Sequence, residues 1–267
     1  MKKVIRACAI QFEPHLNDLE KNRKKIKRLL LKAIKNTHAK LYVLPELAFS
    51  GYNFQSKEEV KETSEVLNKS ESCNLLTTIA QEYETYVVTG INECYESKFY
   101  NSAVCINREG IITVYRKLQL YGKEKKFFTP GNKPLQLFNI NNIKIGLMVC
   151  FDWFFPEIPR TLALQGAHII CHPMNAVIPD GAYLGDRFHS KWNRIFIILT
   201  NRIGKERDLT FIGRSQISDP TGNVLALASV DKEEIITANI DPKLAENKKI
   251  NAYNHVFKDR RPEFYFK

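Results

Sequence analysis

The sequence lacks the features of a membrane-spanning or disulfide-bonded secreted protein. No run approaches the ~18 consecutive apolar residues of a membrane span, and the apolar segment near the N-terminus is too short and interrupted for a signal peptide. The six cysteines form no C-x-x-C pair, and most lie inside apolar runs. We therefore expect reduced thiols, no membrane association and a cytoplasmic location.

Metal-binding and phosphate-binding motifs are also missing. The six histidines are scattered apart from one H-x-x-x-H spacing, His168 and His172, which lies in an apolar run and has no C-x-x-C pair beside it. Neither G-x-G-x-x-G nor G-x-x-x-x-G-K-[ST] occurs. Zinc sites and nucleotide-phosphate loops depend on such patterns. We therefore expect an activity that requires no metal and no cofactor.

The chain has a net charge of +11, and much of it lies in residues 20–35. A stripe with helical spacing runs through this stretch and places the lysines on the opposite face. Its members are Leu19, Arg23, Ile26, Leu29, Leu30, Ala33 and Ile34. Asn17 or Asp18 is placed to cap the helix. The stretch contains no aromatic residues and no known nucleic-acid motif, so we interpret it as a solvated helix face and expect no nucleic-acid partner.

No Ser/Gly/Pro-rich linker, internal repeat or low-complexity tract divides the 267 residues. Apolar strands recur from Val4 to Ile240 and alternate with helical stretches. Such alternation is typical of an α/β layered fold. A chain of this length buries roughly three-quarters of its unfolded surface when it forms one core. We predict a single domain.

Three polar residues stand at the ends of apolar runs: Glu46 after residues 41–44, Lys117 after residues 111–115, and Cys150 after residues 143–149. Continuous apolar runs of this length suit strands covered on both faces. Strand ends are the usual place for chemistry in layered α/β proteins. An acid, a cation and a thiol together indicate a nucleophilic cysteine with its own base and oxyanion stabiliser.

Each of these residues also has a structural interpretation. Cys150 could be a small core residue, as we expect for Cys8, Cys105 and Cys171. Alternatively, it lies at a strand-to-helix turn that leads into a helix expected from about Pro156 to Gln165, near a helix N-terminus that favours the thiolate. Glu46 could serve only as an ion-pair partner.

Lys117 competes with its neighbour Arg116, because strand alternation places the two cations on opposite faces. Only one of them can point into a site.

The segments LPELAFSGY, YRKLQL and GLMVCFDWFFPE resemble the nitrilase superfamily of carbon–nitrogen hydrolases. The resemblance runs from residue 4 to about residue 241. It includes EKKFFTPG at residues 124–131, HPMNA at residues 172–176, NRIG at residues 201–204 and FIGRSQISDPTG at residues 211–222. All of these segments occur in the order that the family has.

The resemblance implies a role for each site residue. Cys150 would be the nucleophile, Glu46 the general base, and Lys117 the oxyanion stabiliser together with the backbone N–H of Phe151. Glu124 matches a second glutamate that supports the base and the lysine. Further residues are expected around the substrate: Tyr52, Trp153 and Asn175.

The resemblance also implies a four-layer α-β-β-α sandwich of the nitrilase type that assembles at least as a homodimer. Residues 247–267 form a charged, poorly periodic C-terminal tail. Its aromatic residues make docking on a partner subunit a better prediction than fraying. They are Tyr253, Phe257, Phe264, Tyr265 and Phe266.

The chain departs from the family pattern in two places. Gln119 stands where many relatives have histidine, and residues 189–192 replace the R-A-x-E of a common R-A-x-E-N segment, while Asn193 is kept. The second change leaves local ion pairing and substrate choice open. His172 and His189 also raise the possibility of a Cys–His dyad, which we disfavour because papain-like flanking motifs are missing.

Within the family that this chain resembles, the residues after the cysteine indicate the substrate class. An aromatic residue and Asp at positions 151 and 152 favour amidases and carbamoyl hydrolases over true nitrilases, although some microbial nitrilases share CFDWFFPE. Carbamoyl-amino-acid hydrolases often carry arginines at the positions where this chain has Trp153 and Phe154. We predict a small aliphatic amide or ω-amide, with an aliphatic nitrile or an N-carbamoyl amine as alternatives and a non-catalytic interaction module as the rival class.

Overall fold

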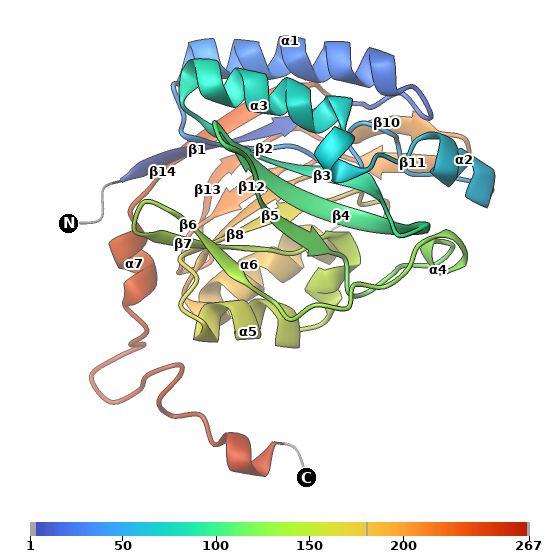
Figure 1. Cartoon of the computed structure of the whole chain (residues 1–267). Helices are drawn as coiled ribbons and strands as arrows, with labels where there is room; N and C mark the ends of the chain where they lie inside the picture. Colours follow the sequence, from blue (N-terminus) through green and yellow to red (C-terminus); the bar gives the residue numbers. More distant parts are fainter. Residues whose placement is uncertain (1–3, 180, 266–267) are drawn as a thin grey trace.

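Two six-stranded sheets lie face to face, and helices cover the outer face of each (Figure 1). The structure is a computed structural model and describes residues 4–179 and 181–265. A large apolar cluster fills the space between the sheets, and separate clusters lie between each sheet and its helices. This arrangement confirms the predicted four-layer α-β-β-α sandwich.

The first sheet contains both parallel and antiparallel strand pairs. Its strands, in the order in which they pair, are β14 (Glu234–Ile240), β1 (Ile5–Gln11), β2 (Leu41–Val43), β3 (Tyr86–Tyr95), β4 (Lys98–Asn107) and β5 (Gly110–Arg116). Strand β2 is parallel to both of its neighbours, and the remaining pairs are antiparallel. The short central strand β2 is buried on both faces, which explains its continuous apolar run.

The second sheet has a parallel centre. Its strands, in pairing order, are β13 (Val224–Leu227), β12 (Gln216–Ser218), β9 (Phe196–Thr200), β8 (Ile169–Pro173), β7 (Ile143–Leu147) and β6 (Leu137–Ile140). Strands β7, β8 and β9 are parallel. A separate hairpin is formed by β10 (Ile203–Glu206) and β11 (Leu209–Ile212).

Helices α1 (Leu19–Thr37) and α3 (Glu71–Tyr83) cover the first sheet, and α5 (Glu157–Leu164) and α6 (Gly181–Asn193) cover the second (Figure 1). The shorter helical segments are α2 (Lys57–Glu62), α4 (Glu124–Phe127), α7 (Pro242–Glu246) and the 3-10 turns η1 (Leu67–Lys69), η2 (Cys150–Phe154) and η3 (Pro262–Phe264). None of the helices in the described part of the chain is long and apolar enough to cross a membrane.

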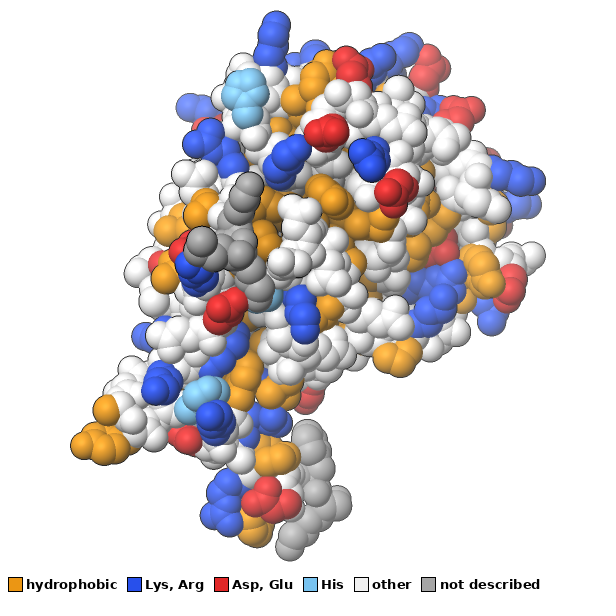
Figure 2. Space-filling view, turned by 60° about the vertical axis from the view of Figure 1, so that its left-hand side comes forward, with side chains coloured by type: hydrophobic (Ala, Val, Ile, Leu, Met, Phe, Trp, Pro, Cys, Tyr) orange, Lys and Arg blue, Asp and Glu red, His pale blue; other side chains and the backbone are white. Residues whose placement is uncertain are grey.

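Helix α1 confirms the amphipathic stripe predicted from the sequence. Asp18 caps it by accepting a hydrogen bond from the Lys21 backbone N–H at 3.0 Å. The stripe from Ile26 to Ile34 is buried, while Leu19 and Arg23 are half-buried at its edge. On the face shown in Figure 2, basic side chains are interspersed with carboxylates. The lysines of α1 therefore belong to a solvated helix face.

Gly90 of β3 allows the segment after β2 to cross the sheet at very close range. A Cβ atom at Gly90 would lie 2.3 Å from the backbone nitrogen of Leu47 and 2.4 Å from the Cα of Glu46. The backbone N–H of Gly90 donates to the carbonyl of Pro45 at 3.0 Å, and that of Ala48 donates to the carbonyl of Gly90 at 3.2 Å. Only glycine leaves room for this contact.

The substitution Gly90→Ala is expected to lower the free energy of unfolding by about 1–3 kcal/mol, because the added methyl group must push two backbones apart. Urea unfolding measures the change. Gly181→Ala is the matched control, because its Cβ would meet only the Trp153 ring at 3.3 Å. An unchanged midpoint for Gly90→Ala would contradict the close approach.

Candidate active site

The Lys117 ammonium joins two carboxylates in the interior of the protein. Lys117 follows β5, and its Nζ donates to Glu46 Oε1 and to Glu124 Oε1, each at 2.8 Å. Glu124 opens α4, and its Oε1 also accepts a hydrogen bond from the Tyr52 hydroxyl at 2.8 Å. All three charged side chains are buried. Buried charges are stable only when paired and hydrogen-bonded, so these groups hold one another in place.

Glu46 is fixed through one carboxylate oxygen. Its Oε1 accepts from Lys117 and also from Asn101 Nδ2 of β4 at 2.7 Å. The other oxygen, Oε2, is buried and has no hydrogen-bond partner among residues 4–179 and 181–265. Asn175 lies alongside, because its Nδ2 donates to the backbone carbonyl of Glu46 at 3.1 Å. One oxygen of Glu46 is thus held, and the other remains available to a substrate.

Cys150 sits on a strained turn between β7 and α5. Its φ angle is +44°, in the left-handed region that non-glycine residues rarely adopt. Asp152 stabilises the turn, because its Oδ2 accepts from the Val149 backbone N–H at 2.9 Å and from the Tyr115 hydroxyl at 2.7 Å. Strand β7 ends at Leu147, earlier than the apolar run predicts, and this capped turn follows.

Asp152 also ties this turn to the segment that carries Lys117. Its Oδ1 accepts from the backbone N–H of Gln119 at 3.0 Å. Burial raises the pKa of Asp152, while the hydrogen bonds from Tyr115 and Val149 act in the opposite direction. A single buried carboxylate therefore fixes the Cys150 turn relative to Lys117.

The expectation that a helix terminus favours the Cys150 thiolate is wrong for this structure. Burial raises the pKa of the Cys150 thiol well above its ordinary value, and the Glu46 carboxylate raises it further. Lys117 and a hydrogen bond from the Asn175 backbone act in the opposite direction but do not outweigh them. Both the burial and the Glu46 carboxylate therefore favour the protonated thiol.

The lysine and the second glutamate are shifted by the same cluster. Burial by itself lowers the pKa of Lys117, but Cys150, Glu124 and Glu46 together raise it well above its ordinary value. Burial raises the pKa of Glu124, and Lys117 partly offsets this. Lys117 consequently stays an ammonium at all physiological pH values.

Arg116 points away from this cluster. Its Nε and Nη2 form a fork with both oxygens of Glu93, at 2.9 and 2.5 Å. Its guanidinium also lies over the rings of Tyr95 and Tyr100. The structure therefore brings Lys117, and not Arg116, to Glu46 and Cys150.

A cavity of about 250 Å³ opens beside Tyr52 and Glu124. Its apolar wall includes Phe54, Tyr121, Phe128 and Val177. Phe151 packs against Tyr121, with ring centroids 5.0 Å apart, and so borders this wall. The structure does not bring Trp153 to the cavity, because its ring lies against Gly181 and Gly185 of α6.

Several residues at the site escaped the sequence analysis. Asn101 supports Glu46 from the buried middle of β4, and a buried amide beside Ser102 was the available signal. Asp152 lay inside the segment already recognised. His172 and Asp186 form a buried pair behind Cys150. No group of His, Cys, Asp or Glu that could hold a metal ion occurs in the described part of the chain.

Comparison with known proteins agrees with the geometry. The family model for carbon–nitrogen hydrolase matches residues 6–249. The chain belongs to the carbon–nitrogen hydrolase family. The predicted resemblance to the nitrilase superfamily is therefore confirmed, and with it the expectation of an enzyme.

Individual relatives extend over most of the chain. A nitrilase of Pyrococcus abyssi is 41% identical over 99% of this chain and 100% of its own length. An (R)-stereoselective amidase of a Pseudomonas species is 31% identical over 83% of this chain and 79% of its own length. The crystal structure of a carbon–nitrogen hydrolase from Helicobacter pylori superposes with a TM-score of 0.86 at 29% identity, covering 98% of this chain and 97% of its own.

The reactivity of Cys150 toward iodoacetamide should rise with pH, because burial and Glu46 keep the thiol protonated. Glu46→Gln removes a negative charge beside the sulfur, lowers the pKa of the thiol and moves the half-maximal alkylation rate to lower pH. Lys117→Met removes the cation beside the sulfur, raises the pKa of the thiol and moves the half-maximal alkylation rate to higher pH. Peptide mass spectrometry between about pH 6 and pH 10 measures the modification.

Cys150→Ala identifies any labelling at other cysteines. Alkylation of the native protein at a rate independent of pH would show a resting thiolate and contradict the assignment.

Proposed function

We propose that this protein is a cysteine hydrolase that cleaves the carbon–nitrogen bond of a small aliphatic amide or ω-amide and releases ammonia. Cys150 is the nucleophile, Glu46 the general base, and Lys117 the oxyanion stabiliser. Glu124 holds Lys117 and Tyr52 in place. The observation that carries the proposal is the set of buried acceptor atoms on Glu46, Glu124 and Asn175 that have no hydrogen-bond partner among the described residues.

In the first half-reaction, Glu46 takes the proton of the Cys150 thiol as the sulfur attacks the amide carbon. Negative charge develops on the amide oxygen, where the Lys117 ammonium and the Phe151 backbone N–H stabilise it. Glu46 then gives its proton to the leaving nitrogen. The carbon–nitrogen bond breaks, ammonia departs, and the acyl group remains as a thioester on Cys150.

In the second half-reaction, Glu46 takes a proton from water, and the resulting hydroxide attacks the thioester carbon. The carbon–sulfur bond breaks and the thiolate leaves. It recovers the proton held by Glu46, and the carboxylic acid is released. The high pKa of the Cys150 thiol helps the cycle to close, because the sulfur is protonated again once the product has formed.

Three buried oxygens support an amide as the substrate. They are Glu46 Oε2, Glu124 Oε2 and Asn175 Oδ1, and none has a hydrogen-bond partner within the described ranges. Leaving a buried acceptor unpaired costs about 1–3 kcal/mol. A primary amide brings two N–H donors on its nitrogen, whereas a nitrile brings none. Oxygens of this kind therefore discriminate in favour of the amide.

The cavity reaches the catalytic cluster only through Tyr52 and Glu124, and it is the proposed place for the remainder of the substrate. A volume of about 250 Å³ with a largely apolar wall suits a short aliphatic chain. Lys123 and Asp208 line it together with the aromatic residues, so a polar group at the far end of the chain can be accommodated. An ω-amide has this form, with an amide at one end and a polar group at the other.

Nitrile hydrolysis is the second candidate, because the Pyrococcus abyssi relative at 41% identity is named a nitrilase. The same cysteine would then form a thioimidate instead of a tetrahedral amide adduct. N-carbamoyl amines remain a further alternative, although Trp153 and Phe154 replace the arginines that would clamp a carboxylate. A non-catalytic role would have no use for a buried base with one oxygen held and the other free.

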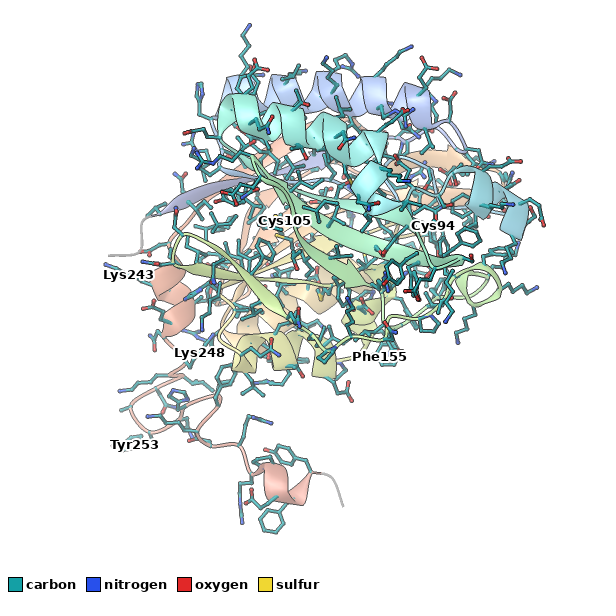
Figure 3. The ribbon with its side chains drawn as sticks, in the orientation of Figure 1. Cys94, Cys105, Phe155, Lys243, Lys248 and Tyr253 are labelled. Atoms are coloured by element: carbon teal, nitrogen blue, oxygen red, sulfur yellow. The ribbon has the colours of Figure 1, made fainter. Side chains whose placement is uncertain are left out.

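Ammonia release from matched short-chain amides, nitriles and N-carbamoyl compounds should be fastest with the amides. Cys150→Ala should lower turnover by more than about 10³-fold, because the nucleophile is lost. Cys94→Ala is the control, since Cys94 lies on β3 and carries no role in the reaction (Figure 3). Faster release from nitriles would overturn the substrate preference. Turnover retained by Cys150→Ala would overturn the mechanism.

We further propose that residues 1–267 form one domain that works as a cytoplasmic homodimer. The aromatic rings of Phe188 and Trp192 stack on the outer side of α6 and are 50% and 53% exposed. Exposed apolar groups of this size mark contact surfaces. A second copy of the chain is the proposed occupant, because the C-terminal tail leaves the body at this helix.

The start of the tail is attached to its own chain. Lys248 Nζ donates to the carbonyls of Asn193 and Arg194 at 3.1 and 2.7 Å, and burial lowers its pKa to about 8. Beyond this point Tyr253 is 93% exposed and points away from the body (Figure 3). Phe264 and Tyr265 are also exposed, and Phe266 lies outside the described residues. Docking on the partner subunit would cover these rings.

Light scattering is expected to give twice the protomer mass of 30.9 kDa. Trp192→Glu should shift the protein toward the monomer, because it places a charge in the proposed contact. Tyr83→Glu is the control, since Tyr83 is similarly exposed on α3, which covers the other sheet. A monomeric native protein, or equal behaviour of the two variants, would contradict the interface.

A further inference from the structure

A fully buried histidine–aspartate pair lies directly behind the Cys150 turn. His172 belongs to β8 and Asp186 to α6, and neither side chain is accessible to solvent. His172 Nδ1 lies 2.7 Å from Asp186 Oδ2, and its Nε2 lies 3.0 Å from the backbone oxygen of Cys150. Both ring nitrogens are thereby occupied, so His172 has no nitrogen left to act as a base toward the thiol.

Hydrogen-bond chemistry assigns the protons of this ring. A carbonyl oxygen can only accept, so Nε2 must carry a proton. A carboxylate also only accepts, so Nδ1 carries the other. With Asp186 as a carboxylate, both ring nitrogens donate and His172 is an imidazolium paired with it. Burial by itself lowers the pKa of His172, but Asp186 and the Cys150 carbonyl raise it, and the net direction is upward. The adjacent Asp152 acts in the same direction as Asp186.

The hydrogen bond from His172 to the Cys150 carbonyl fixes the orientation of the whole Cys150–Phe151 peptide group. The Cys150 C=O and the Phe151 N–H belong to one planar peptide group and point in opposite directions. Holding the oxygen toward His172 therefore aims the N–H away from it. A charged donor on the oxygen also polarises the peptide and makes its N–H a stronger donor. The left-handed φ of Cys150 requires such external support, because it costs about 1–3 kcal/mol.

We propose that the His172–Asp186 pair is a positioning device that orients and polarises the Cys150–Phe151 peptide, so that the Phe151 N–H can stabilise the oxyanion. The inference rests on the proposed cysteine mechanism. His172 touches neither the substrate nor the reacting atoms and acts only through the peptide.

A second histidine on the same turn provides an internal comparison. His189 Nε2 lies 2.7 Å from the backbone oxygen of Trp153, at the far end of η2. That carbonyl belongs to the same peptide group as the N–H of Phe154, and this N–H is not the proposed oxyanion donor. Removal of His189 tests the effect of loosening the turn. Removal of His172 tests the effect of releasing the Cys150–Phe151 peptide.

The test compares amide turnover with alkylation of Cys150 by iodoacetamide. Both reactions need the sulfur, but alkylation displaces iodide from a methylene carbon and develops no oxyanion. His172→Leu is expected to lower kcat for the best amide by about 10²-fold, the usual effect of losing an oxyanion donor. KM and the alkylation rate should each stay within about threefold, because the ground state and the nucleophile are preserved.

Two conservative variants keep the test valid if the leucine variant fails to fold. His172→Gln retains an uncharged donor toward the Cys150 carbonyl and should recover about tenfold of the hundredfold loss in kcat. Asp186→Asn leaves a neutral imidazole that still donates from Nε2, and it should reduce kcat by about tenfold through the lost polarisation. His189→Leu should reduce kcat less than His172→Leu does.

Three results would overturn the inference: kcat of His172→Leu within threefold of the native value, alkylation falling in proportion to turnover, or an equal loss with His189→Leu. Failure of the cysteine mechanism looks different, because Cys150→Ala would then retain turnover.

Discussion

The structure of the site depends on one ammonium group buried between two carboxylates. Lys117 donates to Glu46 and Glu124 at 2.8 Å, and neither carboxylate could remain charged at this depth without it. The arrangement leaves an excess of negative charge, one cation against two anions, so a third anion is disfavoured. Burial raises the pKa of the Cys150 thiol first, and the Glu46 carboxylate adds to it. In the proposed mechanism the thiol reacts as its proton moves to Glu46.

The two sheets contribute different parts of this cluster. Glu46, Asn101 and Lys117 come from the first sheet or the segments that follow its strands, whereas Cys150 and Asn175 follow strands of the second. Asp152 bridges the two by accepting from Val149, Tyr115 and Gln119. Because the groups are held by separate sheets, their spacing depends on how the sheets pack. The close crossing at Gly90 is part of the same requirement, since it sets the depth of Glu46.

The sequence predicted the layers and the three strand-end residues, because apolar runs and helical spacing are local signals. It also predicted the cap of α1 and the buried stripe. The sequence did not predict properties that depend on charges and contacts from distant parts of the chain. A helix terminus at Cys150 suggested a thiolate, but η2 has only five residues, and burial together with Glu46 outweighs it. The His172–Asp186 contact joins β8 to α6, and no spacing rule reveals such a pair.

The proposed substrate is a neutral amide, and the hydrogen-bonding groups of the site match its two ends. The His172–Asp186 pair carries no net charge, and Glu46, Lys117 and Glu124 provide hydrogen-bonding atoms that differ in polarity. An amide presents both kinds of partner, an oxygen that becomes negative and a nitrogen that carries hydrogens. In the proposed mechanism the amide oxygen meets Lys117 and the Phe151 N–H, while the amide nitrogen meets oxygens that have no partner among the described residues. A nitrile presents only the first. In the proposed mechanism, Glu46 and Glu124 thus serve both catalysis and, through their unpaired oxygens, the preference for an amide.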